Sequence, residues 1–335
     1  MEGLKQQIKE QKFKNVMLFH GEETFMLDYY VKKIVELIIG SGEMTMNHDV
    51  FDDRKVVFSS IEDSMDTMPF FSDNRVIILK NLGLFEKTGA NLAGLLSEKM
   101  EHLPSTTYVI IIEPSVDKRI KLYKSVHKNG YICEFPLLGE SELIRYIAKT
   151  LNPYGKKIEQ KEARYLIQYV GDQLTVLHNE INKLINYLGD DEVVTHEAIE
   201  AICQKSVESK IFELVDCMGT KRRARALKLY HDLLSAKEPS NRILFMLTRQ
   251  FRMIYKCKLL LGEGLDSNDI GKKLKLQSFV VRKCLEQGKN FSLNSLEESL
   301  KKCLECEIDI RTGVFILFFL LSHFVKSSIN AGYFS

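Results

Sequence analysis

The sequence has no apolar leader and no apolar run long enough to cross a bilayer. Its opening residues, MEGLKQQIKEQKFKN, are polar throughout, whereas a signal peptide needs an apolar stretch of about 7–15 residues. The longest apolar run covers 314–321 and extends past Ser322 and His323 to Val325, short of the roughly 20 residues of a membrane helix. We therefore expect a cytoplasmic protein without a membrane partner, in which this run is a core helix and His323 is a core or interface residue.

The cysteines and histidines form neither a disulfide framework nor a metal site. Seven irregularly spaced cysteines are typical of reduced thiols in a cytosolic protein. Cys303 and Cys306 form a single C-x-x-C, without the second pair or histidine cluster of a zinc site. The eight histidines show no metal-ligand spacing. H-E-x-x-H, G-x-S-x-G and G-x-G-x-x-G are absent too, so we predict no metal, no cofactor and no catalytic residue.

Charge is unevenly distributed along a chain of ordinary globular composition. With 335 residues, 45% of them apolar, we expect two or three domains. Residues 211–335 contain 21 Lys and Arg against 13 Asp and Glu, whereas residues 1–210 contain 26 against 32. The basic last third either attracts a polyanion or an acidic partner, or is a solvated helical surface.

The first part of the chain predicts an α/β domain over residues 1–138. Helical patterns at Phe25–Ile39 and Ser59–Met68 alternate with short apolar segments, which implies βαβ units and a mainly parallel sheet. Continuous β-branched runs indicate strands buried on both faces. The five expected strands are Val16–Phe19, His48–Asp52, Val76–Leu79, Val109–Ile112 and Tyr131–Phe135.

After Pro136 the pattern becomes helical and predicts two further domains, 139–207 and 208–335. The first contains Ser141–Leu151, Glu159–Val170, Gln173–Leu188 and His196–Cys203, with Ser141 and Thr195 as expected N-caps and Gly189 as a stop. The second contains Ile211–Met218, Arg222–Ala236, Asn241–Leu261, Phe279–Gln287 and a long pattern from Leu293. Leu244, Leu247, Phe251 and Ile254 form a buried stripe in a compact bundle, and Arg249, Arg252 and Lys256 share another face.

The place where a nucleotide-binding α/β protein carries its phosphate loop has the wrong residues for that task. The strand Val16–Phe19 leads into a helix through Gly21, Glu22, Glu23 and Thr24. A phosphate loop requires G-x-x-x-x-G-K-[ST], because backbone amides and a lysine surround the phosphates. Carboxylates at a helix N-terminus suit the helix dipole and repel phosphate, so we predict no ATP hydrolysis.

Two adjacent phenylalanines follow a proline at the end of a predicted helix. Met68 and Pro69 precede Phe70 and Phe71, and polar residues separate them from the strand Val76–Leu79. Either one or both rings turn into the α/β core, or a loop presents both to a partner's pocket. In the second case each buried ring contributes roughly 1.5–3 kcal/mol to binding and acts as a hot spot.

These segments together resemble the delta subunit of the bacterial DNA polymerase III clamp loader, nearly from end to end. The opening VMLFHGEETF is similar to that family's strand, turn and helix, with GEE in place of the phosphate loop. MPFFS followed by RVIILKN resembles its clamp-binding segment and next strand. FELVD at 212–216 and LTRQFR at 247–252 are similar to its C-terminal helices.

The resemblance implies a degenerate AAA+ core, a helical lid and a collar domain that joins a five-subunit ring. It implies Phe70 and Phe71 as the wedge that enters the sliding clamp (the beta subunit), although the family's wedge is commonly Leu-Phe with a glutamine several residues earlier, where Asp66 and Thr67 stand here. Lys80 and Asn81 replace the Asp-Glu of ATPase relatives. The expected partners are the clamp, the tau/gamma motor subunits, the delta-prime subunit and primer–template DNA. Arg249, Arg252 and Lys256 contact DNA or another subunit, or are solvated charges.

Three alternatives belong to other functional classes. An active AAA+ ATPase or helicase loader requires nucleotide binding, against which the acidic turn argues. A polymerase or nuclease needs clustered carboxylates for metal ions, and Asp52-Asp53 and Asp190-Asp191 are typical of turns; a polymerase activity would belong to the holoenzyme that the chain serves. A stand-alone DNA-binding protein is disfavoured by a formal net charge of only +2.

Overall fold

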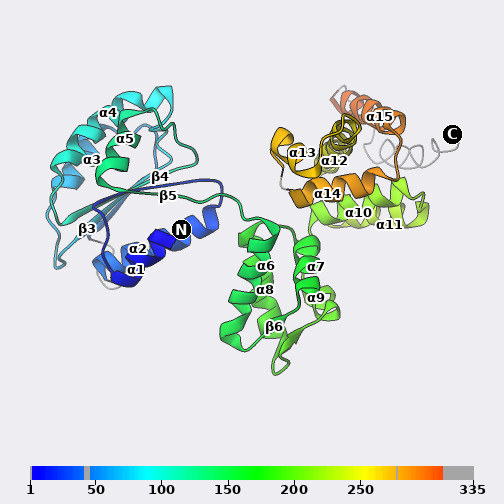
Figure 1. Ribbon diagram of the computed structural model, residues 1–335, viewed down its shortest axis with the longest axis horizontal. Coiled ribbons are helices and arrows are strands. Elements are labelled where there is room, and N and C mark those ends of the chain that lie inside the picture. Colours follow the sequence, from blue (N-terminus) through cyan, green and yellow to red (C-terminus); the bar gives the residue numbers. More distant parts are fainter. Residues whose placement is uncertain (1, 41–45, 277, 312–335) are drawn as a thin grey trace. The chain divides into compact units, whose positions relative to one another are not determined.

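The computed structural model describes residues 2–40, 46–276 and 278–311, and divides into two compact units, Met1–Leu138 and Gly139–Ser335. Figure 1 shows the helices and strands of both units. The predicted helix over 314–321 and His323 lie outside the described residues. The split of the second unit into domains at 139–207 and 208–335 stays a prediction.

The first unit is an α/β fold around a five-stranded parallel sheet of order β2-β3-β4-β1-β5. The strands are β1 (Val16–His20), β2 (His48–Phe51), β3 (Arg75–Lys80), β4 (Thr107–Glu113) and β5 (Tyr131–Glu134). The helices are α1 (Glu2–Glu10), α2 (Thr24–Ile39), α3 (Phe58–Asp66), α4 (Ala90–Lys99) and α5 (Lys121–Asn129), with 3₁₀ turns at Lys87–Gly89 and Met100–His102. The predicted α/β fold with a parallel sheet is confirmed.

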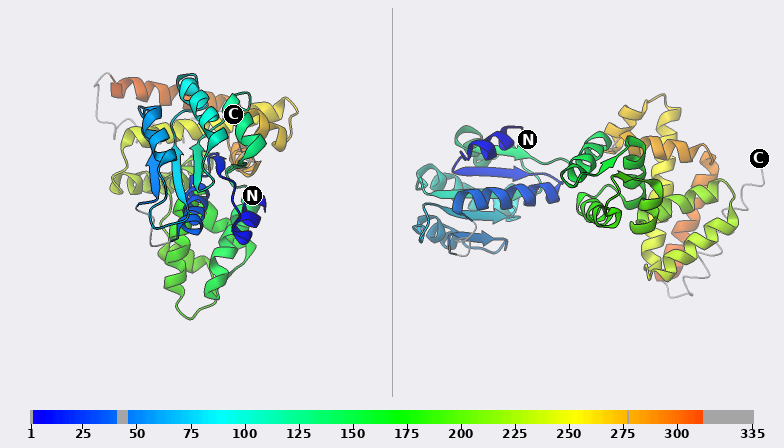
Figure 2. Two further views of the ribbon diagram at one scale, coloured as in Figure 1. Left: turned by 90° about the vertical axis from the view of Figure 1, so that its left-hand side faces the viewer. Right: turned by 90° about the horizontal axis from the view of Figure 1, so that it is seen from below.

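Side chains alternate between the two faces of this sheet because successive strand residues point in opposite directions. Met17 and Phe19 of β1 pack against α1 and α2, whereas Leu18 packs on the other face with residues of α3, α4 and α5. Figure 1 shows this three-layer arrangement, and Figure 2 shows it from two further sides. Both faces are covered by helices, which explains why the strands read as continuous apolar runs.

The second unit is helical, with one short two-stranded parallel ladder. Its first elements are α6 (Glu140–Leu151), a 3₁₀ turn at Asn152–Tyr154, β6 (Lys157–Ile158), α7 (Gln160–Val170), α8 (Leu174–Leu188), β7 (Val193–Val194) and α9 (His196–Ile202). They are followed by α10 (Val207–Gly219), α11 (Arg223–Ser235), α12 (Ser240–Gly262), α13 (Ser267–Leu274), α14 (Ser278–Gly288) and α15 (Leu293–Arg311). The predicted stripe of α12 is confirmed, since Leu244, Leu247, Phe251 and Ile254 are all buried in one cluster.

Several local predictions were incomplete or wrong. The structure adds α1, α4, α5 and α13 and the β6–β7 ladder, for which no element was predicted. Thr195 caps α9 as predicted, with its side chain accepting from the Ala198 amide. Ser141 does not cap α6, because that helix begins one residue earlier. Gly139 is the N-cap instead, and its amide donates to the Glu142 carboxylate over 2.9 Å.

Candidate functional site

The segment between α3 and β3 exposes both of the adjacent phenylalanines. Phe70 is 52% exposed, Phe71 is 83% exposed and the neighbouring Met68 is 85% exposed. The ring centroids of Phe70 and Phe71 lie 4.4 Å apart with the planes at 76°, an edge-to-face pair. Phe71 has a φ of +51°, which a bulky residue rarely adopts. This left-handed residue lets two successive side chains share one side of the loop. Of the two directions that the sequence left open, inward or outward, both rings have the outward one.

A buried asparagine holds the backbone of this loop. The Asn47 side-chain amide donates to the Phe70 carbonyl over 2.7 Å, and its carbonyl oxygen accepts from the Phe70 amide over 2.6 Å. The Asn47 backbone carbonyl accepts from the Val76 amide over 2.8 Å. Asn47 itself is fully buried. It therefore connects the start of β2, the start of β3 and the exposed loop.

Beside Asn47, the buried guanidinium of Arg75 joins three further segments. It donates to the Met46 carbonyl over 3.0 Å and to the Ser64 carbonyl over 3.1 Å, and it pairs with the Asp49 carboxylate. The Ser64 hydroxyl donates to the same carboxylate. A buried cation is stable only when it is paired and hydrogen-bonded, and Arg75 meets that condition at the base of the loop.

The turn where a phosphate loop would lie is short and filled by the chain itself. Only residues 21–23 separate β1 from α2. The Phe135 carbonyl accepts from the Glu23 amide over 3.0 Å, and the Phe135 amide donates to the His20 carbonyl over 2.7 Å. Gly21 has a φ of +133°, and a Cβ there would lie 2.2 Å from the Phe135 carbonyl oxygen. Glu23 is buried, Glu22 is exposed and Thr24 opens the helix.

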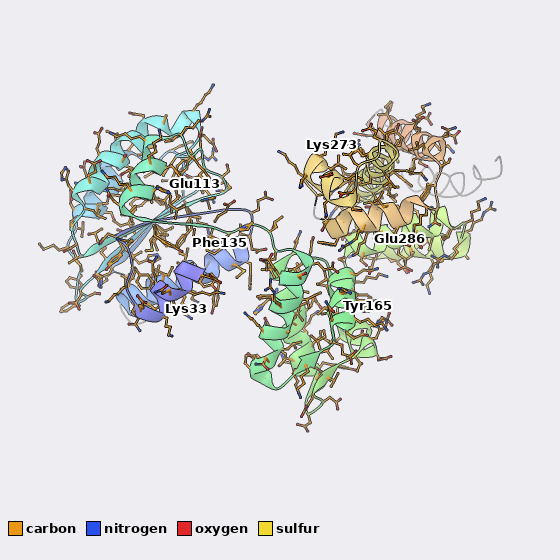
Figure 3. All side chains as sticks on the ribbon, viewed as in Figure 1. Lys33, Glu113, Phe135, Tyr165, Lys273 and Glu286 are labelled. Atoms are coloured by element: carbon orange, nitrogen blue, oxygen red, sulfur yellow. The ribbon has the colours of Figure 1, made fainter. Side chains whose placement is uncertain are left out.

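The polar residues at the carboxyl ends of the neighbouring strands are committed to structural contacts. The Glu113 carboxylate, at the end of β4, accepts from the Leu84 amide over 3.0 Å, and burial raises its pKa. Lys80, at the end of β3, pairs with Asp28 at 3.0 Å. His20 is buried, which lowers its pKa. Figure 3 marks Glu113 and Phe135 within this unit.

The three basic residues of α12 lie on its exposed face. Arg249, Arg252 and Lys256 are all exposed, and within the described chain none forms a salt bridge. Arg249 and Arg252 line one hollow together with Phe245, whose side chain is 67% exposed. The sequence analysis did not identify Phe245 as a candidate. Its position, an aromatic residue on the charged face of an amphipathic helix, was the pattern that could have indicated it.

The C-x-x-C cysteines pack in the helical core. Cys303 and Cys306 belong to α15 and are both buried against residues of α12 and its neighbours. Burial raises the pKa of Cys303 to about 11. Within the described ranges, no group of three or more His, Cys, Asp or Glu side chains is arranged to hold a metal ion, and no helix there combines the length and apolarity of a membrane span.

Two family models match the chain on either side of its middle. The model for "DNA polymerase III, delta subunit" covers residues 17–135, and the model for the C-terminal domain of that subunit covers residues 208–325. The chain belongs to the delta-subunit family of DNA polymerase III. Its membership associates it with the DNA polymerase III complex.

Individual relatives agree with this assignment over most of their length. The DNA polymerase III subunit delta of Bacillus subtilis (strain 168) is 25% identical over 305 residues, covering 89% of this chain and 88% of the relative. The probable DNA polymerase III subunit delta of Aquifex aeolicus (strain VF5) is 23% identical over 301 residues, covering 83% of each. The solved structure of the Bacillus subtilis DNA clamp loader delta protein (YqeN) matches in fold, with a TM-score of 0.73 over 98% of this chain and 99% of that one, at 24% identity.

Proposed function

We propose that this chain binds and opens a ring-shaped sliding clamp through Phe70 and Phe71, so that the clamp is loaded onto primed DNA. The observation that carries the proposal is the exposure of both rings, at 52% and 83%, on one loop fastened to a buried asparagine. Exposed aromatic pairs are costly to leave in water and act as anchors in a partner's pocket. Membership of the delta-subunit family supports the sliding clamp as the proposed partner.

Clamp opening requires more than affinity. A ligand shifts a two-state partner only by binding one state better than the other. Burying each ring contributes roughly 1.5–3 kcal/mol, and that energy favours opening only to the extent that the open ring accepts the loop better than the closed ring does. We propose that a mismatch between this α/β unit and the closed ring supplies the difference.

We propose further that the chain has no ATPase activity of its own. A phosphate loop surrounds phosphate with several free backbone amides and a lysine, but here the turn has three residues, and the Phe135 carbonyl accepts the Glu23 amide. Lys80 at the end of β3 pairs with Asp28. The corresponding measurement is titration with a fluorescent ATP analogue and Mg²⁺, for which we expect no saturable binding; tight binding would favour the active-ATPase alternative.

The second unit, in this proposal, contains the lid (α6 to α9) and the collar (α10 to α15), which joins the motor subunits tau/gamma and the delta-prime subunit in a cytoplasmic complex. Phe245 beside Arg249 and Arg252 favours a protein contact over DNA for this face of α12, because aromatic residues and arginine are enriched at protein interfaces. Any contacts to DNA within the complex would go to phosphates, and the DNA affinity would then fall steeply as the salt concentration rises.

The decisive experiment measures binding of the purified chain to its own organism's clamp, without ATP, beside the Phe70→Ala/Phe71→Ala double variant. Phe245→Ala, which removes an equally exposed ring from the other unit, is the matched control. We expect the double variant to lose most of the affinity while staying folded, and the control to bind as wild type. Absence of binding by the wild-type chain, with the clamp confirmed active, would refute the proposal.

A further inference from the structure

At Phe70 the backbone of the exposed loop is bonded to a side chain from a distant part of the sequence, which we call the anchor. Asn47 lies 23 positions before Phe70 and contributes one donor and one acceptor to it, at 2.7 and 2.6 Å. This pairing imitates the two-bond pairing of neighbouring strands, but it uses a side-chain amide in place of a backbone. The amide side chain carries both the donor and the acceptor on one planar group, which this pairing uses.

Both partners of this contact are constrained on their other sides. Asn47 is fully buried, and its own carbonyl accepts from Val76 at the start of β3. Its neighbour Met46 is held by the Arg75 guanidinium over 3.0 Å. The Asn47 side chain is therefore fixed in position by the sheet, and its two hydrogen bonds fix the Phe70 backbone of a loop whose side chains are exposed.

The residue after the anchored one has an unfavourable backbone conformation. Phe71 has a φ of +51°, and a left-handed conformation is unfavourable for an L-residue. Such conformations persist where the surrounding structure determines them. The pair of bonds at Phe70 is the contact nearest to Phe71 that does so, and without it the loop is free to relax and separate the rings.

We propose that Asn47 is a positioning residue for partner binding: it fixes the Phe70 backbone so that both rings project together before the partner arrives. The proposal rests on the function proposed above. Asn47, being buried, does not touch the partner. It acts by removing the cost of ordering the loop on binding, which is how preorganisation raises affinity.

The test combines a local and a functional measurement on the full-length chain. Asn47→Ala removes both bonds, and Asn47→Ser serves as a second variant with a small polar side chain. The control is Asn15→Ala, because the Asn15 amide also fastens backbone in this unit. It donates to the Ser105 and Thr107 carbonyls at the start of β4, at 3.0 and 2.9 Å, and not to Phe70. Urea unfolding of each variant gives its free energy of unfolding, so that the variants are compared with their stabilities known.

The hydrogen-exchange rate of the Phe70 amide measures whether Asn47 holds the loop. The affinity for the clamp measures whether that contact contributes to binding. We expect both Asn47 variants to speed exchange at Phe70 and to weaken clamp binding by about tenfold or more, the scale of two ordinary hydrogen bonds. Asn15→Ala, compared at a similar free energy of unfolding, is expected to change neither the exchange rate at Phe70 nor the clamp affinity. In the Phe70→Ala/Phe71→Ala background, Asn47→Ala should cause no further loss, as a double-mutant cycle requires of coupled residues.

Two results would overturn the inference. Unchanged exchange at Phe70 would show that Asn47 does not hold the loop. Faster exchange with wild-type affinity would show that holding the loop is irrelevant to binding. Failure of the proposed function is distinguishable, because a wild-type chain that does not bind the clamp refutes the positioning role together with that function, whereas the exchange data still report whether the anchor exists.

Discussion

The ring of Phe71 meets the ring of Phe70 edge to face, at a centroid distance of 4.4 Å. Neighbouring residues on a strand or helix point in different directions, so this contact depends on the left-handed backbone of Phe71. The pair is thus a property of the loop conformation as much as of the residue types.

This dependence separates two apolar substitutions of similar volume. β-Branched side chains disfavour a positive φ, so Phe71→Ile is expected to bind the clamp about tenfold more weakly than Phe71→Leu, a difference near 1.4 kcal/mol. Surface-bound clamp titrated with each variant would measure it. Equal affinities would show that the left-handed conformation is not needed in the complex.

Gly21 provides a test of the turn that replaces the phosphate loop. Its substitution by alanine adds a Cβ only 2.2 Å from the Phe135 carbonyl oxygen, at a φ of +133°. We expect Gly21→Ala to lower the free energy of unfolding by about 2–5 kcal/mol, since strain and overpacking add. Gly40→Ala is the control, with a φ of +90° but no atom of the described residues within 4 Å of the new Cβ, and should cost about 1 kcal/mol. Equal losses in urea unfolding would contradict the close approach.

Arg75 is expected to matter for stability far more than its partner Asp49. Arg75→Met leaves the Met46 and Ser64 carbonyls without this donor and the Asp49 carboxylate without its cation, although the Ser64 hydroxyl still donates to Asp49. Each charged hydrogen bond contributes about 1.5–3 kcal/mol, so a loss of at least that size is expected. Asp49→Asn removes the counter-charge of the buried Arg75 guanidinium and should also destabilise the fold. Its cost should be smaller, because the Met46 and Ser64 carbonyls still accept from Arg75. The reverse order, measured by denaturant unfolding, would contradict this account.

His48 links stability to pH in the neutral range. Burial lowers its pKa from 6.5, and the charge of nearby Asp49 offsets part of that shift. Below pH 6.5 the unfolded chain binds a proton that the folded chain does not, so the free energy of unfolding falls as pH decreases toward the folded-state pKa. His48→Leu should therefore flatten the decline between pH 7.5 and the acid limb, and His20, whose pKa burial also lowers, should retain part of it.

The control for this titration is His127→Leu, which removes an exposed histidine of α5. Urea unfolding at half-unit pH intervals measures the slope for each variant. A slope that His48→Leu leaves unchanged would contradict the account, as would a stability that rises on acidification through this range.

The elements that sequence patterns predicted are those whose burial is continuous or strictly periodic. Val76–Leu79 is buried on both faces of the sheet and therefore appears as an uninterrupted apolar run. α1 was missed because Leu4 is its one fully buried residue, which is too little for a helical stripe. Ser141 has the residue type of a cap, but the Glu142 side chain selects Gly139 by accepting its amide.

The candidate loop shows a different limit of sequence reasoning. That Phe70 and Phe71 are exceptional follows from their type and their place after Pro69. Whether they face inward or outward depends on the φ of one residue and on a bond from Asn47, 23 positions away. Neither the φ of Phe71 nor the bond from Asn47 produces a periodic sequence pattern, so the sequence was consistent with rings that face inward and with rings that face outward.

The Phe135 carbonyl that closes the β1–α2 turn has a consequence for dosage in the cell. In the function proposed above, the chain binds no nucleotide at this turn, so the proposed clamp affinity of a free copy does not change with the cellular ATP concentration. Each free copy would then hold one clamp out of circulation. We expect overproduction of the chain alone to slow replication in proportion to the excess over its complex partners, and the same excess carrying Phe70→Ala/Phe71→Ala to be harmless.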